Sequence, residues 1–302
     1  MNWLWAVLWV LFALGVLAAI WGIGIERHLR VIRYEPQPLP VLPAGSKPIR
    51  VLHISDFHLA PWQQRKIAWI ARLSKLDVDL VIDTGDNLGH RDAVDPVLIA
   101  LGGLSGKPGG FVNGSNDYFA PKARNLLSYL RAPSERLSNT PLDTERLIAG
   151  FERFGWVNLN NRGGQVLVNG MRVGLVGIDD HHDGLSDLGS IADSKAALAN
   201  SDVIIGVSHA PYLAVIDAFN EAEIPVLFAG HTHGGQVCVP GFGALTTNCD
   251  LPTKAAKGLS SWSKNGHQLW LNVCAGLGHS IFAPVRFACR PEVRVVTLVA
   301  KA

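Results

Sequence analysis

Several metal-binding side chains follow apolar runs of the chain directly. The apolar runs at 51–54, 80–82, 203–207 and 225–229 are each followed within a few residues by histidine or aspartate. In an open α/β sheet, ligand sites form beyond the carboxyl ends of the strands, so we expect these side chains to meet at one place. The residues concerned are Asp56, His58, Asp86, His209, His231 and His233.

The spacing within this set also suits metal binding. Asp56 and His58 are two residues apart, as are His231 and His233, and residues i and i+2 of an extended chain point to one face. Gly230 permits a tight turn before the second pair. Imidazole and carboxylate donors together favour Zn, Fe or Mn over Ca or Mg. Because one ion needs three or four ligands, six or seven candidates predict two divalent ions, which one carboxylate could bridge.

A single histidine at a strand end is more often a structural hydrogen-bonding group than a ligand, so the prediction rests on the joint occurrence. His53 lies inside the first apolar run and is expected to be a buried hydrogen-bonding residue. The stretch 179–183, Asp-Asp-His-His-Asp, is also rich in donors. It either borders the metal site and the substrate or forms a solvated turn with carboxylates bonded to backbone amides.

The elements that must position these residues alternate along the chain. Apolar runs and helical periodicity predict strand–helix units, and Asn169-Gly170 between two apolar runs predicts a two-residue hairpin. This mixture predicts an α/β fold of two packed mixed β-sheets flanked by helices. The expected strands cover 50–55, 79–84, 109–113, 166–168, 172–178, 203–207, 225–229, 269–275 and 293–299. The expected helices cover 63–76, 96–104, 145–154, 190–199 and 211–222, with a loop at 131–144.

The first 26 residues predict a single transmembrane helix. Residues 3–25 are almost wholly apolar and uncharged, and about 20 such residues span a hydrocarbon core of about 30 Å. A cleaved signal peptide is the alternative, but no basic residue precedes the apolar run. Arg27, Arg30 and Arg33 follow it, which places the catalytic domain on the cytoplasmic side of the cell membrane by the positive-inside rule. These arginines could also pair with anionic head groups.

Composition bears on the domain organisation and on which other classes of function are excluded. The Pro-rich segment 27–48 predicts a stiff juxtamembrane linker, and 49–302 is then the catalytic domain. A net charge of +2 without basic and aromatic clusters argues against nucleic-acid binding. The four cysteines form no C-x-x-C pair and are expected to be free thiols, and no G-x-S-x-G nucleophile motif is present. The sequence does not determine the oligomeric state.

The motifs resemble those of the calcineurin-like metallophosphoesterases, over residues 49 to the C-terminus. That family has D-x-H, G-D, G-N-H-[DE], a histidine and G-H-x-H, and the membrane-anchored bacterial branch also has an N-terminal span. The matching segments here are Asp56-Phe57-His58, Gly85-Asp86, Gly114-Ser115-Asn116-Asp117, His209 and Gly230-His231-Thr232-His233. The resemblance implies a four-layer α/β/β/α sandwich. It also implies one ion on Asp56, His58, Asp86 and His233, and a second on Asp86, an Asn, His209 and His231.

One block departs from the family pattern. An ungapped match puts Ser115 at the position of the family's Asn ligand and Asn116 at that of its substrate-facing His. We expect a local backbone shift that lets Asn116 supply the ligand, because a neutral Ser115 hydroxyl is a poor replacement; Ser115 remains the alternative. The histidine is missing on either alignment. Because positioned proton transfer contributes about 10²–10⁴ in rate, bonds with an acidic leaving group are favoured.

These observations predict a membrane-anchored phosphoesterase with two divalent metal ions. Metal-bound hydroxide would attack phosphodiester or pyrophosphate bonds, with Asp86, Asn116 and His209 as the catalytic residues. The anchor would suit a lipid-linked phosphate ester. One alternative is a metal-binding scaffold at the membrane with impaired catalysis. Another is a phosphomonoesterase or protein phosphatase.

Overall fold

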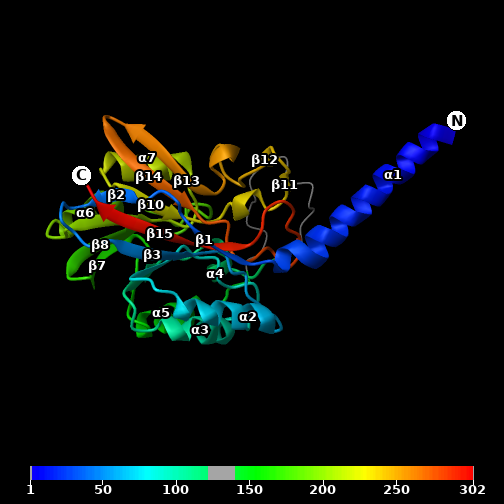
Figure 1. The fold of residues 1–302 in the computed structure, drawn as a ribbon. Helices are drawn as coiled ribbons and strands as arrows, with labels where there is room; N and C mark the ends of the chain where they lie inside the picture. The colour runs from blue at the N-terminus through cyan, green and yellow to red at the C-terminus, as the bar shows by residue number, and fades with distance from the viewer. Residues whose placement is uncertain (1, 122–139, 302) are drawn as a thin grey trace.

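Two β-sheets pack face to face in the computed structural model, which describes residues 2–121 and 140–301 (Figure 1). Sheet 1 comprises β1 (Val31–Tyr34), β2 (Leu39–Leu42), β3 (Ile49–Ile54), β4 (Leu80–Asp83), β5 (Gly109–Phe111), β6 (Trp156–Asn158) and β15 (Glu292–Ala300). Sheet 2 comprises β7 (Arg162–Val168), β8 (Met171–Gly177), β9 (Val203–Val207), β10 (Val226–Ala229), β13 (Gly258–Lys264) and β14 (His267–Val273). A small hairpin of β11 (Cys238–Val239) and β12 (Gly243–Ala244) lies outside both.

Both sheets are mixed, as the sequence predicts. In sheet 1, β3, β4, β5 and β6 run parallel, while β15 is antiparallel to β3. In sheet 2, β8, β9, β10 and β14 run parallel, and β7 and β13 are antiparallel at the edges. The central strands β4 and β10 are buried at every residue, which is typical of parallel strands covered on both faces. The carboxyl ends of the parallel strands carry the predicted ligands.

Helices cover the outer face of each sheet, which completes an α/β/β/α sandwich (Figure 1). One apolar core lies between the sheets and combines residues such as Val51 and Ile82 of sheet 1 with Ile205 and Phe228 of sheet 2. Sheet 1 is covered by α2 (Gln64–Ala71), α3 (Val94–Leu101) and α5 (Thr144–Arg153). Sheet 2 is covered by α6 (Ser190–Ala197) and α7 (Leu213–Glu221). The predicted four-layer fold is therefore confirmed.

Local patterns predicted most of these elements. The hairpin of β7 and β8 turns at Asn169 and Gly170, whose φ angles of 51° and 86° belong to the left-handed region that a type I′ turn requires. The helix expected over 63–76 ends as α2 at Ala71 and continues as a 3-10 turn, η3 (Arg72–Lys75). The strands β6, β11, β12 and β13 were not predicted. Part of the loop expected at 131–144 lies outside the described residues.

The Pro-rich segment is not the free linker that its composition predicts. Its residues form β1 and β2, which pair in parallel with the two halves of β15. Leu39 and Leu42 are fully buried in the core between the sheets. Proline lacks an amide donor, but an edge strand does not need every donor, so Pro40 is accommodated within β2. Segment 27–48 therefore contributes strands to sheet 1.

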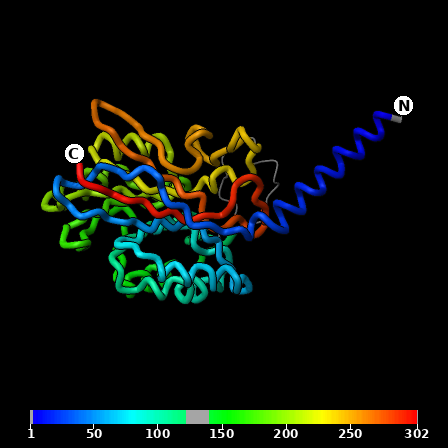
Figure 2. Tube along the Cα trace, viewed as in Figure 1, coloured from blue at the N-terminus to red at the C-terminus, as the bar shows by residue number. Residues whose placement is uncertain are grey.

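The N-terminal helix α1 (Asn2–Ala19) projects away from the sandwich, and the C-terminus lies at the opposite end (Figures 1 and 2). It continues through a π-helical stretch, η1 (Ile20–Ile25), and a 3-10 turn, η2 (Glu26–His28). By length and composition, 3–28 is one helix that could cross a membrane, with a mean hydropathy of 2.5 and 6% of its most apolar window buried. An N-terminal signal sequence has the same properties.

The base of this helix is held by a buried carboxylate. Glu26 accepts hydrogen bonds from the backbone amides of Ala288 and Cys289, at 3.0 and 2.7 Å, and from the Trp21 indole at 2.6 Å. The amide of Arg286 donates to the carbonyl oxygen of Gly22 at 3.1 Å. We call this contact, formed by Gly22, Glu26 and the loop 286–289, the helix root. It fixes where the helix leaves the domain.

Candidate metal centre

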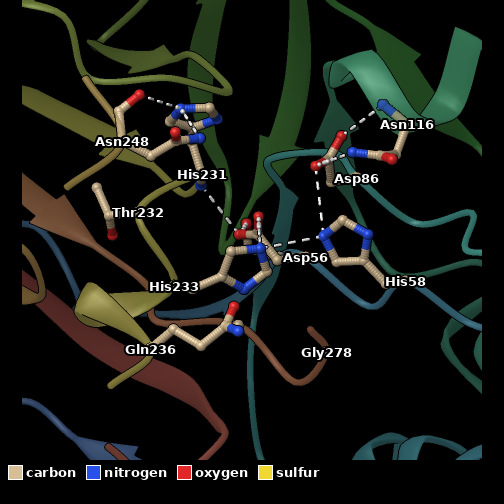
Figure 3. Close-up of polar contacts among 12 residues, drawn as sticks. Asp56, His58, Asp86, Asn116, His231, Thr232, His233, Gln236, Asn248 and Gly278 are labelled. Carbon is tan, nitrogen blue, oxygen red and sulfur yellow. Dashed lines mark hydrogen bonds and ion pairs between the residues drawn. The ribbon is translucent and has the colours of Figure 1, made fainter. Parts of the chain in front are cut away.

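The predicted ligands converge at the carboxyl ends of strands from both sheets (Figure 3). Asp56 and His58 follow β3, Asp86 follows β4, and His209 follows β9. His231 and His233 follow β10, and His233 begins a 3-10 turn, η6 (His233–Gly235). Asn116 lies in the short helix α4 (Ser115–Tyr118) after β5. The structure therefore brings all seven candidates into one region.

Five of these seven residues adopt a left-handed backbone conformation, with φ between 40° and 68°. They are Asp56, His58, Asp86, His231 and His233. This conformation costs a residue other than glycine about 1–2 kcal/mol. Such strain persists only where the surrounding structure imposes it, and it clusters at functional sites. The backbone turns sharply at each strand end, which directs these side chains inward.

The first group of side chains consists of Asp56, His58 and His233. Their Nε2 atoms face each other at 3.1 Å, and His233 Nε2 lies 3.7 Å from Asp56 Oδ1. Asp56, His58 and His233 each offer one donor atom within 4.8 Å of the others. The other carboxylate oxygen of Asp56 is held by the Ser55 hydroxyl and by the amide of His231 at 3.0 Å. Asp56 is thus anchored through one oxygen and directs the other toward the histidines.

The second group contains His209 and His231, whose outward nitrogens contact backbone carbonyl oxygens. His209 Nδ1 donates to the carbonyl oxygen of Thr84 at 2.7 Å, which leaves Nε2 directed into the site. His231 Nε2 lies 3.2 Å from the carbonyl oxygen of Asn248, which leaves Nδ1 directed inward. The two inward nitrogens are 3.3 Å apart. A backbone carbonyl that orients the far nitrogen is a common support for a metal-binding histidine.

Asp86 lies between the two groups. Its Oδ2 is 3.4 Å from His58 Nε2 and 3.6 Å from His209 Nε2, so one carboxylate faces both. The backbone amide of Asn116 donates to Asp86 Oδ1 and the side-chain amide donates to Oδ2, both at 2.8 Å (Figure 3). Gly114 allows this approach, because a Cβ there would lie 2.3 Å from Asp86 Oδ1. Asp86 Oδ2 is therefore close to imidazoles of both groups.

Asp117 organises the loop that carries Asp86. Its buried carboxylate accepts hydrogen bonds from the backbone amides of Asp86, Asn87, Leu88 and Gly114, at 2.8 to 3.1 Å. Burial and the nearby Asp86 raise the pKa of Asp117 to about 7. Four backbone donors on one carboxylate fix the loop after β4 against the loop after β5. This arrangement orients Asp86.

The four histidines of the site differ in pKa, and therefore in protonation state at pH 7. Burial lowers the pKa of His58 to about 4, and it lowers those of His231 and His233 well below their ordinary value, so these imidazoles are neutral at pH 7. Burial also lowers the pKa of His209, but Asp86, Asp180 and Asp56 outweigh it and raise the value to about 9. Burial raises the pKa of Asp56 to about 6. Three neutral imidazoles suit metal coordination, which requires the deprotonated ring.

The donor set fits two divalent cations. It combines two carboxylates, four imidazoles and one amide, which matches the N/O ligands that Zn, Fe or Mn prefer. Asp56 Oδ1 and His58 Nδ1 are buried without a hydrogen-bond partner. A buried carboxylate oxygen without a partner is costly, and a cation would remove that cost for Asp56. The clusters Asp56-His58-His233 and Asp56-Asp86-His209 share Asp56, and Asp86 also lies 3.4 Å from His58 Nε2, as expected for adjacent ions.

Comparison with known proteins agrees with this geometry. The sequence model of the calcineurin-like phosphoesterase family matches residues 49–235. The chain belongs to that family. This family is one of metal-dependent phosphoric ester hydrolases with two divalent metal ions.

One bacterial relative covers nearly the whole chain. It is 24% identical over 301 residues to the uncharacterized metallophosphoesterase YkuE of Bacillus subtilis (strain 168), with 95% of this chain and 93% of YkuE covered. It is 26% identical over 203 residues to YkoQ of the same organism, with 66% of each chain covered. Among solved structures, TT1561 of Thermus thermophilus is similar at 13% identity and a TM-score of 0.42, with 76% of this chain and 91% of that chain covered.

The loop 179–183 borders the metal centre of this phosphoesterase. Asp179 accepts two hydrogen bonds from the Tyr118 hydroxyl, at 2.7 and 2.9 Å, which ties the loop to α4. The ring of His182 lies 4.6 Å from that of His231, and its Nδ1 is 2.8 Å from the Tyr212 hydroxyl. The loop thus lies beside a predicted ligand, and it also forms the amide-bonded turn of the second interpretation, since Asp180 Oδ1 accepts from the amide of His182 at 3.1 Å. His53, in contrast, contacts Asn272 and Thr84 in the core, as predicted.

Arg286 supports the site and was not predicted. Its guanidinium is fully buried and donates to the carbonyl oxygens of His233 at 2.7 Å, Ala275 at 2.7 Å and Gly278 at 3.1 Å. It therefore fixes the turn that carries His233. The sequence offers no indication of this, because Arg286 lies 53 residues beyond His233 in a segment without a motif. His279 is buried, and its Nδ1 lies 2.9 Å from the carbonyl oxygen of Ser280.

Proposed function

We propose that this protein is a membrane-anchored phosphoesterase that hydrolyses phosphodiester or pyrophosphate bonds. Asp56, His58, Asp86 and His233 would hold one ion, and Asp86, Asn116, His209 and His231 would hold the other. The position of Asp86 between the imidazoles of His58 and His209 carries this assignment. When bound, two divalent ions would lower the pKa of a water molecule and offset the charge on the phosphate oxygens.

Asn116 rather than Ser115 is proposed as the amide ligand. Its side chain already contacts the shared oxygen of Asp86, and half a turn about χ2 exchanges its amide nitrogen for its oxygen. Asp117 holds the backbone of this block, and Gly114 lets Asn116 approach Asp86. With Asn116 as the ligand, the block has no histidine next to the substrate, where the family pattern has one.

The proposed preference for acidic leaving groups follows from the missing histidine. An amide cannot deliver a proton to an alkoxide, whereas a nucleoside monophosphate or a nitrophenolate departs without one. Positioned proton transfer contributes about 10²–10⁴ in rate, so the difference between substrates should be large. We propose cytidine diphosphate diacylglycerol and aryl diesters as substrate models, and a lipid-linked phosphate ester as the natural class. The α1 helix, embedded in the membrane, would hold the enzyme at such a substrate.

The test compares four phosphate esters with the full chain in detergent micelles, reconstituted with Mn²⁺. Bis(p-nitrophenyl) phosphate and cytidine diphosphate diacylglycerol should be cleaved at least about 10²-fold faster than glycerol phosphate. p-Nitrophenyl phosphate separates a phosphomonoesterase, which would cleave it faster than the diester. A chelator should abolish all turnover. Faster cleavage of glycerol phosphate would contradict the proposed preference, and no turnover of any ester would favour the scaffold alternative.

The membrane face is a separate proposal. Arg27, Arg30 and Arg33 follow the apolar helix, which favours a cytoplasmic catalytic domain. Protease treatment of intact cells or spheroplasts should leave the domain uncut if it is cytoplasmic. Cleavage at the domain in intact spheroplasts would place it on the other face.

A further inference from the structure

Large apolar side chains are exposed around one end of the sandwich. They lie on the β11–β12 hairpin and its flanks and on the loop between β14 and β15. Phe242, at the tip of the hairpin, is 75% exposed. We call this set the apolar rim; it consists of Val237, Val239, Phe242, Leu245 and Phe282.

The segments that carry the rim contain no Asp, Glu, Lys or Arg. This holds for 236–249 and for 274–285. A loop at a water-exposed surface ordinarily carries charges, and an uncharged loop with an exposed phenylalanine is costly in water. The rim therefore has the composition of a surface that is covered in the working protein.

The rim is continuous with the N-terminal helix. A groove of about 720 Å³ lies between them, lined on one side by Leu17, Trp21 and Ile25 and on the other by Pro240 and Phe287. β11, β12 and the base of α1 lie at the same end of the molecule (Figures 1 and 2). Arg290 also lines the groove and donates to the carbonyl oxygen of Leu29 at 2.9 Å. A membrane that surrounds the N-terminal helix near the helix root would therefore also contact the apolar rim.

The same segments form one side of the metal centre. The hairpin begins shortly after the turn that carries His233, and Gly278 donates its amide to the carbonyl oxygen of Asp56 at 2.7 Å. Gln236 and Gly278 border His233 in Figure 3. The side chain of His233 is 16% exposed, whereas His58 is 4% and His209 is 0% exposed. Of these three imidazoles, the one that solvent reaches is next to the rim.

We propose that the apolar rim rests in the headgroup region of a lipid bilayer and presents the metal centre to lipid phosphates. This inference rests on the proposed membrane anchor and phosphoesterase activity, and it identifies the surface through which a lipid substrate arrives. Phenylalanine and leucine side chains insert at the boundary between head groups and acyl chains, and arginines there are attracted to anionic head groups. Phe242 and Phe282 supply the first, and Arg27 and Arg290 at the helix root supply the second. A bilayer is favoured over a protein partner because the rim continues directly into a helix long enough to span one.

The first experiment measures insertion without using activity. Full-length Phe242→Trp protein is reconstituted into phosphatidylcholine vesicles with and without brominated acyl chains, and the emission of the wild type is subtracted. Leu167→Trp is the matched control, because Leu167 is 65% exposed on β7, far along sheet 2 from the rim. Quenching of the emission from the tryptophan introduced at the rim, with none for the control, supports the proposal. If bromination quenches the introduced tryptophan of Phe242→Trp no more than that of Leu167→Trp, the proposal is overturned.

The second experiment separates delivery of the substrate from chemistry. Phe242→Glu and Leu167→Glu are compared on cytidine diphosphate diacylglycerol in vesicles and on water-soluble bis(p-nitrophenyl) phosphate. Phe242→Glu should lose at least about 10-fold on the lipid, because a charge disfavours the membrane interface, and should stay within about 2-fold on the soluble ester. Leu167→Glu should change neither rate. An unchanged lipid rate for Phe242→Glu, or a change in oligomer size without quenching, shows that protein or water covers the rim and overturns the proposal.

Failure of the proposed function gives a different result. In that case the wild type cleaves neither ester, while the quenching experiment still decides whether the rim meets lipid. Circular dichroism of both glutamate variants checks folding.

Discussion

The metal centre and the helix root both bury carboxylates, but they satisfy them differently. At the helix root, Glu26 accepts three hydrogen bonds and its charge is matched by protein donors. At the metal centre, Asp56 keeps one buried oxygen without a donor, and imidazole nitrogens face each other at 3.1 and 3.3 Å. Because an unpartnered buried polar atom is costly, natural proteins retain it where a ligand will meet it. At the helix root, protein donors satisfy the buried carboxylate. At the metal centre, the buried Asp56 Oδ1 has no protein donor and is available to a bound cation.

Arg286 connects the two regions. Its backbone amide contacts Gly22 at the helix root, while its guanidinium holds the carbonyl oxygen of His233. The loop after β14 therefore serves both, and changes at one region should be compared with changes at the other.

The largest effect is expected from Asp86→Asn at the metal centre. Loss of the shared carboxylate should lower activity by about 10³-fold or more, on the scale of losing a charge-stabilising group from an active site. Bound metal, measured by mass spectrometry, should fall below two ions per chain. Asp193→Asn on α6 is the control, since that residue is exposed. Full metal content in Asp86→Asn would show that Asp86 is not a ligand.

A smaller loss of activity is expected from Gly114→Ala. The added Cβ would meet Asp86 Oδ1 at 2.3 Å and His209 Cε1 at 2.7 Å, so both side chains must move. A displacement of about 1 Å in an active site can cost about 10²-fold in rate. Gly102→Ala is the control, because nothing lies within 4 Å of a Cβ there. Equal rates for the two variants would mean that Asp86 and His209 tolerate displacement.

Glu26→Gln should affect the helix root alone. An amide presents only one acceptor oxygen to the amides of Ala288 and Cys289, and a buried donor left unpaired costs about 1–3 kcal/mol. We expect a lower melting temperature in detergent and faster proteolysis near residues 27–30, with metal content unchanged. Exposed Glu152→Gln is the control. Loss of metal from Glu26→Gln would show that the two regions are more strongly coupled than Arg286 alone provides.

The pH dependence of metal binding sharpens the same contrast. In the metal-free protein His209 has a pKa raised to about 9, so it is protonated at pH 7.5 and must lose that proton to bind a cation. Binding should release about one proton between pH 6 and 9, and affinity should rise about tenfold per pH unit there. Below pH 6, Asp56, with a pKa of about 6, adds a second proton. Calorimetry in buffers of different ionisation enthalpy counts these protons, and His209→Gln should release almost none at pH 7.5.

Local sequence predicted the parts of the molecule that depend on neighbouring residues. The hairpin at Asn169-Gly170 requires two positive φ angles, which that dipeptide supplies. The six aspartates and histidines could be found because each follows one of four strands within a few residues, and parallel strands end at a common edge. Composition predicted segment 27–48 less well, because its prolines suggested a linker although its buried leucines and valine form a strand against β15.

The sequence alone determined the fold class, the set of metal-binding side chains and the apolar N-terminal helix, because each is encoded in short-range spacing or composition. Only the tertiary structure placed Asp86 between His58 and His209, directed Asn116 toward it, and supported His233 by Arg286. It also decided that β15 pairs with β1, β2 and β3, and that the apolar rim adjoins the helix root. These contacts join residues far apart in the chain, and their geometry depends on how two sheets pack rather than on any local pattern.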